Sequence, residues 1–286
     1  MYPAQFEYHT AGTVKEAVDL LAKYKDEAKL LAGGHSLLPA MKLRLAQPKH
    51  LIDIGKVSGL AGVKEEGGTL VIGAMTTHYA IESSAVLKSK CPLLPEVAGH
   101  IGDPMVRNLG TLGGSLAHAD PAADWPAAVI ALGAELVAEG PKGKRTIKVD
   151  DFFKGLLTTA LAENEILTEI RVPACGANVK CAYAKFPHPA SRFAVVGVAA
   201  VLTMDGGKIG KASIGITGAG TKATRAKGVE AAIAGKPADA ASIQAAASSA
   251  AEGVDVQADL QGSVEYKQHL LRVFAKRAME AAAAKK

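Results

Sequence analysis

The chain alternates between apolar residues at helical spacing and short apolar runs typical of buried strands. Thr13 and Glu16 have the spacing of a capping box, which predicts that a helix begins there. The apolar residues that follow share one helix face: Val14, Ala17, Val18 and Leu21. Apolar runs over 28–32 and 51–55 predict strands, and a helix is expected over 37–45. Residues 1–56 therefore resemble a β-α-β unit.

The pattern changes near residue 57 and again near residue 176. The middle stretch predicts strands over 69–75 and 165–172, helices over 79–88, 95–101 and 122–132, a glycine loop over 110–114 and a hairpin across 140–143. The last stretch predicts strands over 180–186, 193–204 and 208–217, then Ala-rich helices over 224–234, 238–252 and 263–284. The predicted fold class is α+β. We expect one domain over 1–176, with subdomains 1–56 and 57–176, and a second domain over 177–286. No internal repeat is evident.

Composition narrows the class of protein. The 286 residues are 49% hydrophobic and 21% charged, which excludes collagen, a disordered tail and a disulfide scaffold. The net charge of +5 is spread along the chain except for the block 142–145, so no nucleic-acid partner is expected. The N-terminus lacks the features of a signal peptide, and no apolar run predicts a membrane span. We expect a cytoplasmic protein.

The cysteines are few and far apart. Cys91, Cys175 and Cys181 form no C-x-x-C pair and have no histidines at zinc spacing beside them. We expect buried, inert thiols. The chain alone cannot ligate an iron–sulfur cluster, which needs four ligands. We expect no metal site.

Two glycine segments could approach a ligand through their backbone. Ala32-Gly33-Gly34-His35-Ser36 follows a predicted strand, and its consecutive N–H groups could form an anion-binding nest. Thr111-Leu112-Gly113-Gly114-Ser115 has the same character, so the two segments could hold the two phosphates of a dinucleotide. Neither segment is a Rossmann or Walker fingerprint, and an ordinary strand-to-helix turn explains the first equally simply.

Asp120 and Asp124 follow the second segment, where a carboxylate could accept hydrogen bonds from ribose or ribityl hydroxyls or from a ring N–H. The alternatives are a turn before Pro121 for Asp120 and the first turn of a helix for Asp124. His100 near Asp103, and His118 near Asp120, are better explained as solvated loop histidines. With no nucleophile elbow, Cys/His pair or H-E-x-x-H motif, no catalytic residue is assigned.

With these segments the chain resembles a family. Residues 32–57 and 101–127, together with Arg171–Pro173, 183–200 and 259–279, are similar to the FAD-binding medium subunit of molybdenum hydroxylases, the xanthine dehydrogenase superfamily. The aerobic carbon monoxide dehydrogenase type is the most similar branch. The resemblance implies an FAD-binding fold of the vanillyl-alcohol oxidase (PCMH) type in two subdomains, then a three-stranded antiparallel sheet with a helical bundle.

The resemblance also implies the site and the partners. In the family the AGGHS and T-[IL]-G-G segments bind the FAD pyrophosphate, and the second domain approaches the isoalloxazine ring. The implied cofactor-binding residues are Ala32, Gly33, Gly34, His35, Ser36, Leu37, Thr111, Leu112, Gly113, Gly114, Ser115, Asp120, Asp124, Lys185 and Phe193. Many relatives have Tyr at the position of Phe193. For Lys185 and Phe193 the alternatives are a solvated strand residue and a core residue.

The resemblance implies that this chain is the subunit through which electrons leave the enzyme complex. A molybdenum-pterin large subunit and a small subunit with [2Fe–2S] clusters would deliver electrons to non-covalent FAD here, in a dimer of heterotrimers, and an external acceptor would receive them. That acceptor could also bring the complex to the inner face of the membrane. Two alternatives stay open: a self-sufficient flavin oxidase with FAD attached through His35, and a non-enzymatic adaptor or nucleotide sensor with a vestigial site. The chain carries no obvious acid–base pair for the first of these.

Overall fold

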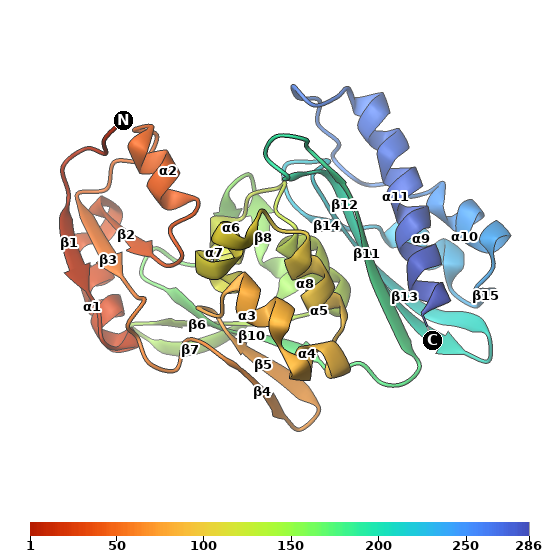
Figure 1. Cartoon of the computed structure of the whole chain (residues 1–286), viewed down its shortest axis with the longest axis horizontal. Coiled ribbons are helices and arrows are strands. Elements are labelled where there is room, and N and C mark those ends of the chain that lie inside the picture. Colours follow the sequence, from red (N-terminus) through yellow and green to blue (C-terminus); the bar gives the residue numbers. More distant parts are fainter. Residues whose placement is uncertain (286) are drawn as a thin grey trace.

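The computed structural model describes residues 1–285, which form three units in chain order (Figure 1). The first unit is a three-stranded parallel sheet in the order β1-β3-β2, with α1 packed against it. Its elements are β1 (Glu7–Thr10), α1 (Val14–Tyr24), β2 (Ala28–Leu31), α2 (Leu37–Lys42) and β3 (His50–Asp53). Thr13 accepts the Glu16 N–H as the predicted cap of α1. The β-α-β interpretation is confirmed, with β1 as an additional strand that the pattern did not predict.

The middle unit is a five-stranded antiparallel sheet in the order β4-β5-β10-β6-β7. Its strands are β4 (Val63–Glu66), β5 (Thr69–Gly73), β6 (Glu135–Gly140), β7 (Gly143–Lys148) and β10 (Ile166–Pro173), with a small hairpin of β8 (Phe153–Gly155) and β9 (Thr158–Thr159). Its helices are α3 (His78–Ser83), α4 (Ala85–Lys90), α5 (Leu93–Gly99), α6 (Pro104–Leu109), α7 (Leu112–His118) and α8 (Trp125–Leu132). They lie between this sheet and the C-terminal sheet (Figure 1).

Two expectations for the middle unit were wrong, and two of its elements were not predicted. The helix expected over 79–88 is two helices, because Ser84 has an extended backbone and caps α4 through the Leu87 N–H. The loop expected over 110–114 ends at Thr111, since α7 begins at Leu112. Helix α6 and strand β4 were not predicted. Both are short, so neither shows enough periodicity to be read from the sequence.

The third unit is an antiparallel sheet in the order β11-β12-β13-β14, with β15 also paired to β13. The elements are β11 (Val179–Pro187), β12 (Ala194–Asp205), β13 (Lys208–Thr217), β14 (Thr224–Arg225), α9 (Lys227–Ile233), β15 (Lys236–Pro237), α10 (Ala240–Ala247) and α11 (Val264–Ala284). The three long strands are as expected. The two-residue strands β14 and β15 correct the sheet to five strands. Strand β14 takes the start of the helix expected over 224–234, and α10 is shorter at both ends than the helix expected over 238–252.

Strand β12 is buried on both faces. Helix α11 packs along β11 and β12, while α8 of the middle unit packs on β12 and β13. Burial on both faces explains the unbroken run of buried residues over 194–200. In a sheet with one solvent-exposed face, apolar and polar residues would alternate instead. The contact with α8 is close: a Cβ on Gly215 would lie 2.0 Å from the Ala127 carbonyl oxygen. The core of the middle unit therefore continues into the C-terminal sheet through Cys181, Tyr183 and Ala199.

Candidate functional site

The first glycine motif, residues 32–36, lies where β2 ends. The carboxyl ends of parallel strands are where ligands bind in open α/β sheets. Gly34 has a φ of +76°, a left-handed conformation that turns the chain into α2. The backbone N–H groups of residues 33–36 donate no hydrogen bond to another backbone group of residues 1–285. The motif therefore presents a row of free donors, which suits an anion such as a phosphate.

The second glycine motif, residues 111–115, is the start of a helix. Thr111 caps α7 and accepts the Gly114 N–H at 3.1 Å through its hydroxyl. Three more amides of the motif are occupied within the chain: Leu112 donates to Thr76, Gly113 to Ala74 and Ser115 to Thr111. This motif offers a ligand its side chains and its surface, not a row of free amides.

The two motifs touch one another. A Cβ on Gly33 would lie 2.2 Å from the Leu109 carbonyl oxygen and 2.8 Å from the Gly110 Cα, so only glycine fits there. A Cβ on Gly114 would lie 3.5 Å from that of Ala32. Leu37 begins α2 beside the first motif, and His35 and Ser36 are exposed. The structure therefore brings together the two segments that the sequence singled out, although about 75 positions separate them along the chain.

A buried histidine that the sequence did not single out lies behind the second motif. The His78 Nδ1 accepts a hydrogen bond from the Trp125 indole N–H at 3.0 Å. A Cβ on Gly110 would lie 2.7 Å from its Nε2. Burial, together with the nearby charges of His35 and Arg107, lowers the pKa of His78 to about 4. The ring is therefore neutral at pH 7, with its proton on Nε2. A lone histidine at a helix start gives no sequence signal for this role.

Asp124 and Lys185 form a buried ion pair that joins α8 to β11. The Lys185 Nζ lies 2.8 Å from one Asp124 carboxylate oxygen, and the Tyr183 hydroxyl donates to the other at 2.5 Å. Both side chains of the pair are less than a tenth exposed. Burial raises the pKa of Asp124, while Lys185 and Tyr183 oppose that shift. Lys185 is thus no solvated strand residue, and the contact of either residue with FAD stays a prediction.

Asp120 and Phe193 have more open surroundings. The Asp120 carboxylate accepts the Ala122 N–H at 2.8 Å, which is the turn around Pro121 given above as the alternative to FAD binding. Phe193 is 43% exposed, so it is not a core residue. Its neighbour Arg192 donates to the Gly102 carbonyl at 3.1 Å, which places this loop beside the turn that leads into α6. Contact of Asp120 or Phe193 with FAD also stays a prediction.

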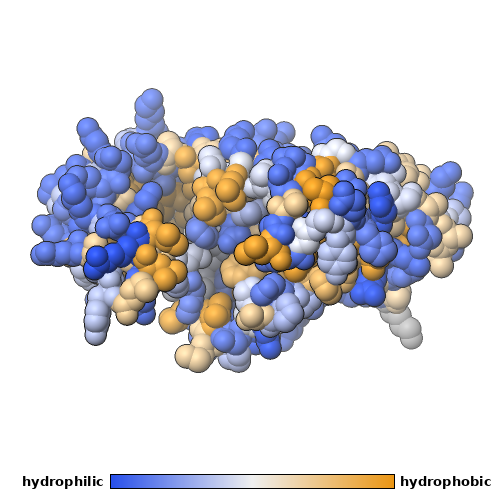
Figure 2. Space-filling view, turned by 90° about the horizontal axis from the view of Figure 1, so that it is seen from above, coloured by the Kyte–Doolittle hydropathy of each residue, from blue (hydrophilic) through white to orange (hydrophobic). Residues whose placement is uncertain are grey.

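Large apolar side chains are exposed directly after the first motif and directly before the second. They are Leu38, Leu43 and Leu45 on one side and Met105 and Leu109 on the other. Figure 2 shows apolar groups on both sides of a hollow between the first unit and the rest of the molecule. Exposed apolar patches of this kind mark surfaces that a ligand or another protein covers.

The three cysteines lie together although they are far apart in the sequence. Cys91 and Cys181 are buried and Cys175 is half-buried. The pKa of Cys175 is raised to about 12: the Cys181 thiol lowers it, but the Cys91 thiol and burial raise it more. Thiols with such a pKa remain protonated at pH 7 and are poor nucleophiles. The expectation of buried, unreactive thiols agrees with this packing.

Comparison with known proteins gives matches over nearly the whole chain. The family described as "FAD binding domain in molybdopterin dehydrogenase" matches residues 4–175, and "CO dehydrogenase flavoprotein C-terminal domain" matches residues 181–282. The carbon monoxide dehydrogenase medium chain of Hydrogenophaga pseudoflava is 45% identical over 99% of this chain and 98% of that protein. The corresponding chain of Afipia carboxidovorans is 38% identical over 100% and 99%.

Solved structures agree with the sequence matches. A carbon monoxide dehydrogenase structure from Hydrogenophaga pseudoflava matches with a TM-score of 0.97 and 47% identity, covering 99% of both chains. Quinoline 2-oxidoreductase from Pseudomonas putida matches with a TM-score of 0.93 and 32% identity, over 99% of this chain and 98% of that one. Among residues 1–285 no helix has the length and apolar character needed to cross a membrane. The chain belongs to the family of FAD-binding medium subunits of molybdenum hydroxylases, of the aerobic carbon monoxide dehydrogenase type.

Proposed function

We propose that this chain receives electrons from [2Fe–2S] clusters of a partner subunit and passes them through FAD to an external acceptor. The observation that carries the proposal is the row of free amides at residues 33–36, held against the second glycine motif. FAD would supply the redox chemistry, because its ring accepts electrons and gives them up again. The chain's own contribution is binding, orientation and electrostatics.

The residues present fit the pyrophosphate part of FAD. The amides of the first motif are directed donors for phosphate oxygens, and Ser36 adds a hydroxyl that makes no capping bond to α2. In the second motif, the buried Thr111 hydroxyl already caps the Gly114 N–H, so the half-buried Ser115 supplies the hydroxyl that a ligand can reach. Gly33 and Gly34 carry no side chain, which lets the phosphates approach the backbone of the first motif closely.

The exposed apolar residues beside the motifs support assembly with partners. We propose that they face the isoalloxazine ring and the iron–sulfur subunit, and that Phe193 and the Asp124–Lys185 pair position the C-terminal domain against the ring. The complex would also contain a molybdenum-binding large subunit, as a dimer of heterotrimers in the cytoplasm. A stable contact of this kind buries roughly 1,600 Å².

The test compares the isolated chain with the reconstituted complex. Equilibrium titration should give one FAD per chain, and acid precipitation should release the flavin into the supernatant. In anaerobic stopped-flow absorbance, carbon monoxide should leave the flavin of the isolated chain oxidised, while dithionite should bleach it. Adding the molybdenum and iron–sulfur subunits should restore substrate-dependent bleaching. Reduction of the isolated chain by substrate, or flavin that stays attached through His35 in acid, would favour a self-sufficient oxidase instead.

A further inference from the structure

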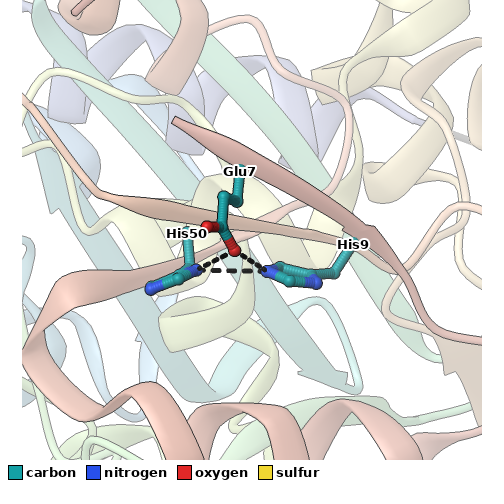
Figure 3. A group of neighbouring side chains, drawn as sticks. All are labelled: Glu7, His9 and His50. Carbon is teal, nitrogen blue, oxygen red and sulfur yellow. Dashed lines mark hydrogen bonds and ion pairs between the residues drawn. The ribbon is translucent and has the colours of Figure 1, made fainter. Parts of the chain in front are cut away.

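A cluster of two histidines and one glutamate lies in the first unit (Figure 3). Glu7 and His9 are on β1, and His50 is on the neighbouring strand β3. Glu7 is paired with His50 in the parallel register, and residues two apart along a strand share one face. The cluster lies at the amino ends of these strands, whereas the first glycine motif follows the carboxyl end of β2. It is therefore separate from the proposed FAD site.

The three side chains point toward a common centre (Figure 3). The His9 Nε2 and His50 Nδ1 lie 3.1 Å apart. The Glu7 Oε2 lies 3.4 Å from His50 Nδ1 and 3.8 Å from His9 Nε2. A point about 2.0 Å from all three atoms exists, which is the length of zinc–nitrogen and zinc–oxygen bonds. A hydrogen bond between the two rings would explain the 3.1 Å separation alone, but not the carboxylate oxygen beside both nitrogens.

Neighbouring groups hold the two imidazoles in place. The ring of Tyr24, at the end of α1, stacks on His50 at 3.7 Å between ring centroids and on His9 at 5.0 Å. The side chains of His9 and His50 are 22% and 13% exposed, while that of Glu7 is 71% exposed. The nitrogen ligands are thus fixed and mostly buried, and the carboxylate side is open to solvent. Such packing around the ligands is what tunes a metal site.

We propose that Glu7, His9 and His50 bind a divalent transition-metal ion of the zinc class, with a coordination position left open to water. Imidazole and carboxylate ligands suit zinc, and a set of two histidines and one glutamate leaves a fourth position free. The ion would join the edge strand β1 to β3, and so stabilise the unit that carries the first glycine motif.

The test is calorimetric titration of the untagged, metal-depleted full chain with Zn²⁺. We expect one site per chain, weakened at least tenfold in His9→Gln and in His50→Gln. His269→Gln removes an exposed histidine of α11 and serves as the matched control, with unchanged affinity. Binding of Co²⁺ should give the visible absorbance of a low-symmetry, histidine-ligated ion. No Zn²⁺ uptake, or equal affinity in all variants, would reduce the cluster to a hydrogen-bonded histidine pair.

A second variant guards against misfolding. Glu7→Gln keeps both imidazoles and changes an exposed side chain, so its fold is not at risk; we expect its Zn²⁺ affinity to fall several-fold. Zn²⁺ should raise the melting temperature of the wild type more than that of Glu7→Gln. An equal rise in both would overturn the proposal. Flavin content is measured separately, so a failure of FAD binding leaves the zinc result interpretable.

Discussion

The two glycine motifs have similar sequences but use their backbones in opposite ways. The first follows a strand of a parallel sheet, and the amides of residues 33–36 have no backbone acceptor among residues 1–285. The second begins a helix, and its amides donate to Thr76, Ala74 and Thr111. A pair of glycines therefore does not reveal which way the backbone faces. The element that precedes the motif decides whether its donors remain free for a ligand.

The same difference gives the glycines different roles. Gly34 is needed for its left-handed conformation, which exposes the amides. Gly113 has no positive φ; it is needed because α7 lies directly against the end of β5, where a Cβ would meet Ala74 at 2.4 Å. We therefore expect substitution of Gly34 to act on FAD affinity and substitution of Gly113 to act on stability.

The largest effect is expected for Gly113→Val. Its side chain would collide with the Cβ, the carbonyl oxygen and the Cα of Ala74, and the backbone there cannot move without separating α7 from the sheet. We expect the free energy of unfolding to fall by about 3 kcal/mol. Urea denaturation of the FAD-free chain measures this loss. A variant with full stability and lost FAD affinity would show that Gly113 faces the ligand, and would break the comparison.

Protonation of His78, which lies behind the second motif, should lower the free energy of unfolding at acidic pH. The pKa of His78 is about 4 in the folded chain, against an ordinary value near 6.5 when unfolded. Between pH 6.5 and pH 4, His78 is protonated in the unfolded chain but not in the folded chain. The free energy of unfolding therefore decreases as the pH falls from 6.5 toward 4. This group should cost about 2 kcal/mol between pH 7 and pH 5. His78→Gln should lose correspondingly less stability over that interval; equal slopes in urea denaturation would contradict the assignment.

Much of the fold was predictable because it rests on long periodic segments. The Thr13 cap of α1, the hairpin at 205–207 and the 21-residue helix α11 are confirmed within a few residues. The short elements were missed or merged. One serine, Ser84, splits a helix that the apolar pattern continues through, because its backbone conformation is set by the helix that follows.

The candidate site was predictable as two segments, but not as a three-dimensional arrangement. The glycine patterns and the family resemblance located residues 32–36 and 111–115. Neither the glycine patterns nor the resemblance indicated that the amides of the second motif are hydrogen-bonded within the chain. Two of their acceptors, Ala74 and Thr76, lie in the turn after β5. His78 and the cluster of Glu7, His9 and His50 also depend on distant partners. A parallel strand pairing joins residues 7 and 50, and no local pattern encodes it.

Gly34→Ala should weaken FAD binding about tenfold, roughly 1.4 kcal/mol, because an Ala disfavours the left-handed backbone that aims the amides. Gly59→Ala is the matched control. Gly59 has a φ of +80° and no atom within 4 Å of its Cβ position, so this variant carries the same backbone strain outside both motifs. Gly34→Ala should lose more stability than Gly59→Ala, because its Cβ would also lie 2.9 Å from Leu38 Cδ1. Only Gly34→Ala should lose FAD affinity in fluorescence titration. Equal affinities would mean that the first motif is an ordinary turn.

The smallest expected effects are changes in FAD affinity in two serine variants, one in each motif, which distinguish binding through backbone amides from binding through side chains. With its amides occupied, the second motif can contribute hydroxyl groups, so Ser115→Ala should weaken FAD about fivefold, close to 1 kcal/mol. Ser36→Ala should cost twofold or less, because the free amides around it still hold the phosphates. Ser89→Ala, at an exposed position of α4, is the control for a lost hydroxyl and should change nothing. All three affinities can be measured by flavin fluorescence at one salt concentration. A larger loss in Ser36→Ala than in Ser115→Ala would reverse the roles assigned to the two motifs, because the first would then bind FAD mainly through a side chain and the hydroxyl of the second would contribute less.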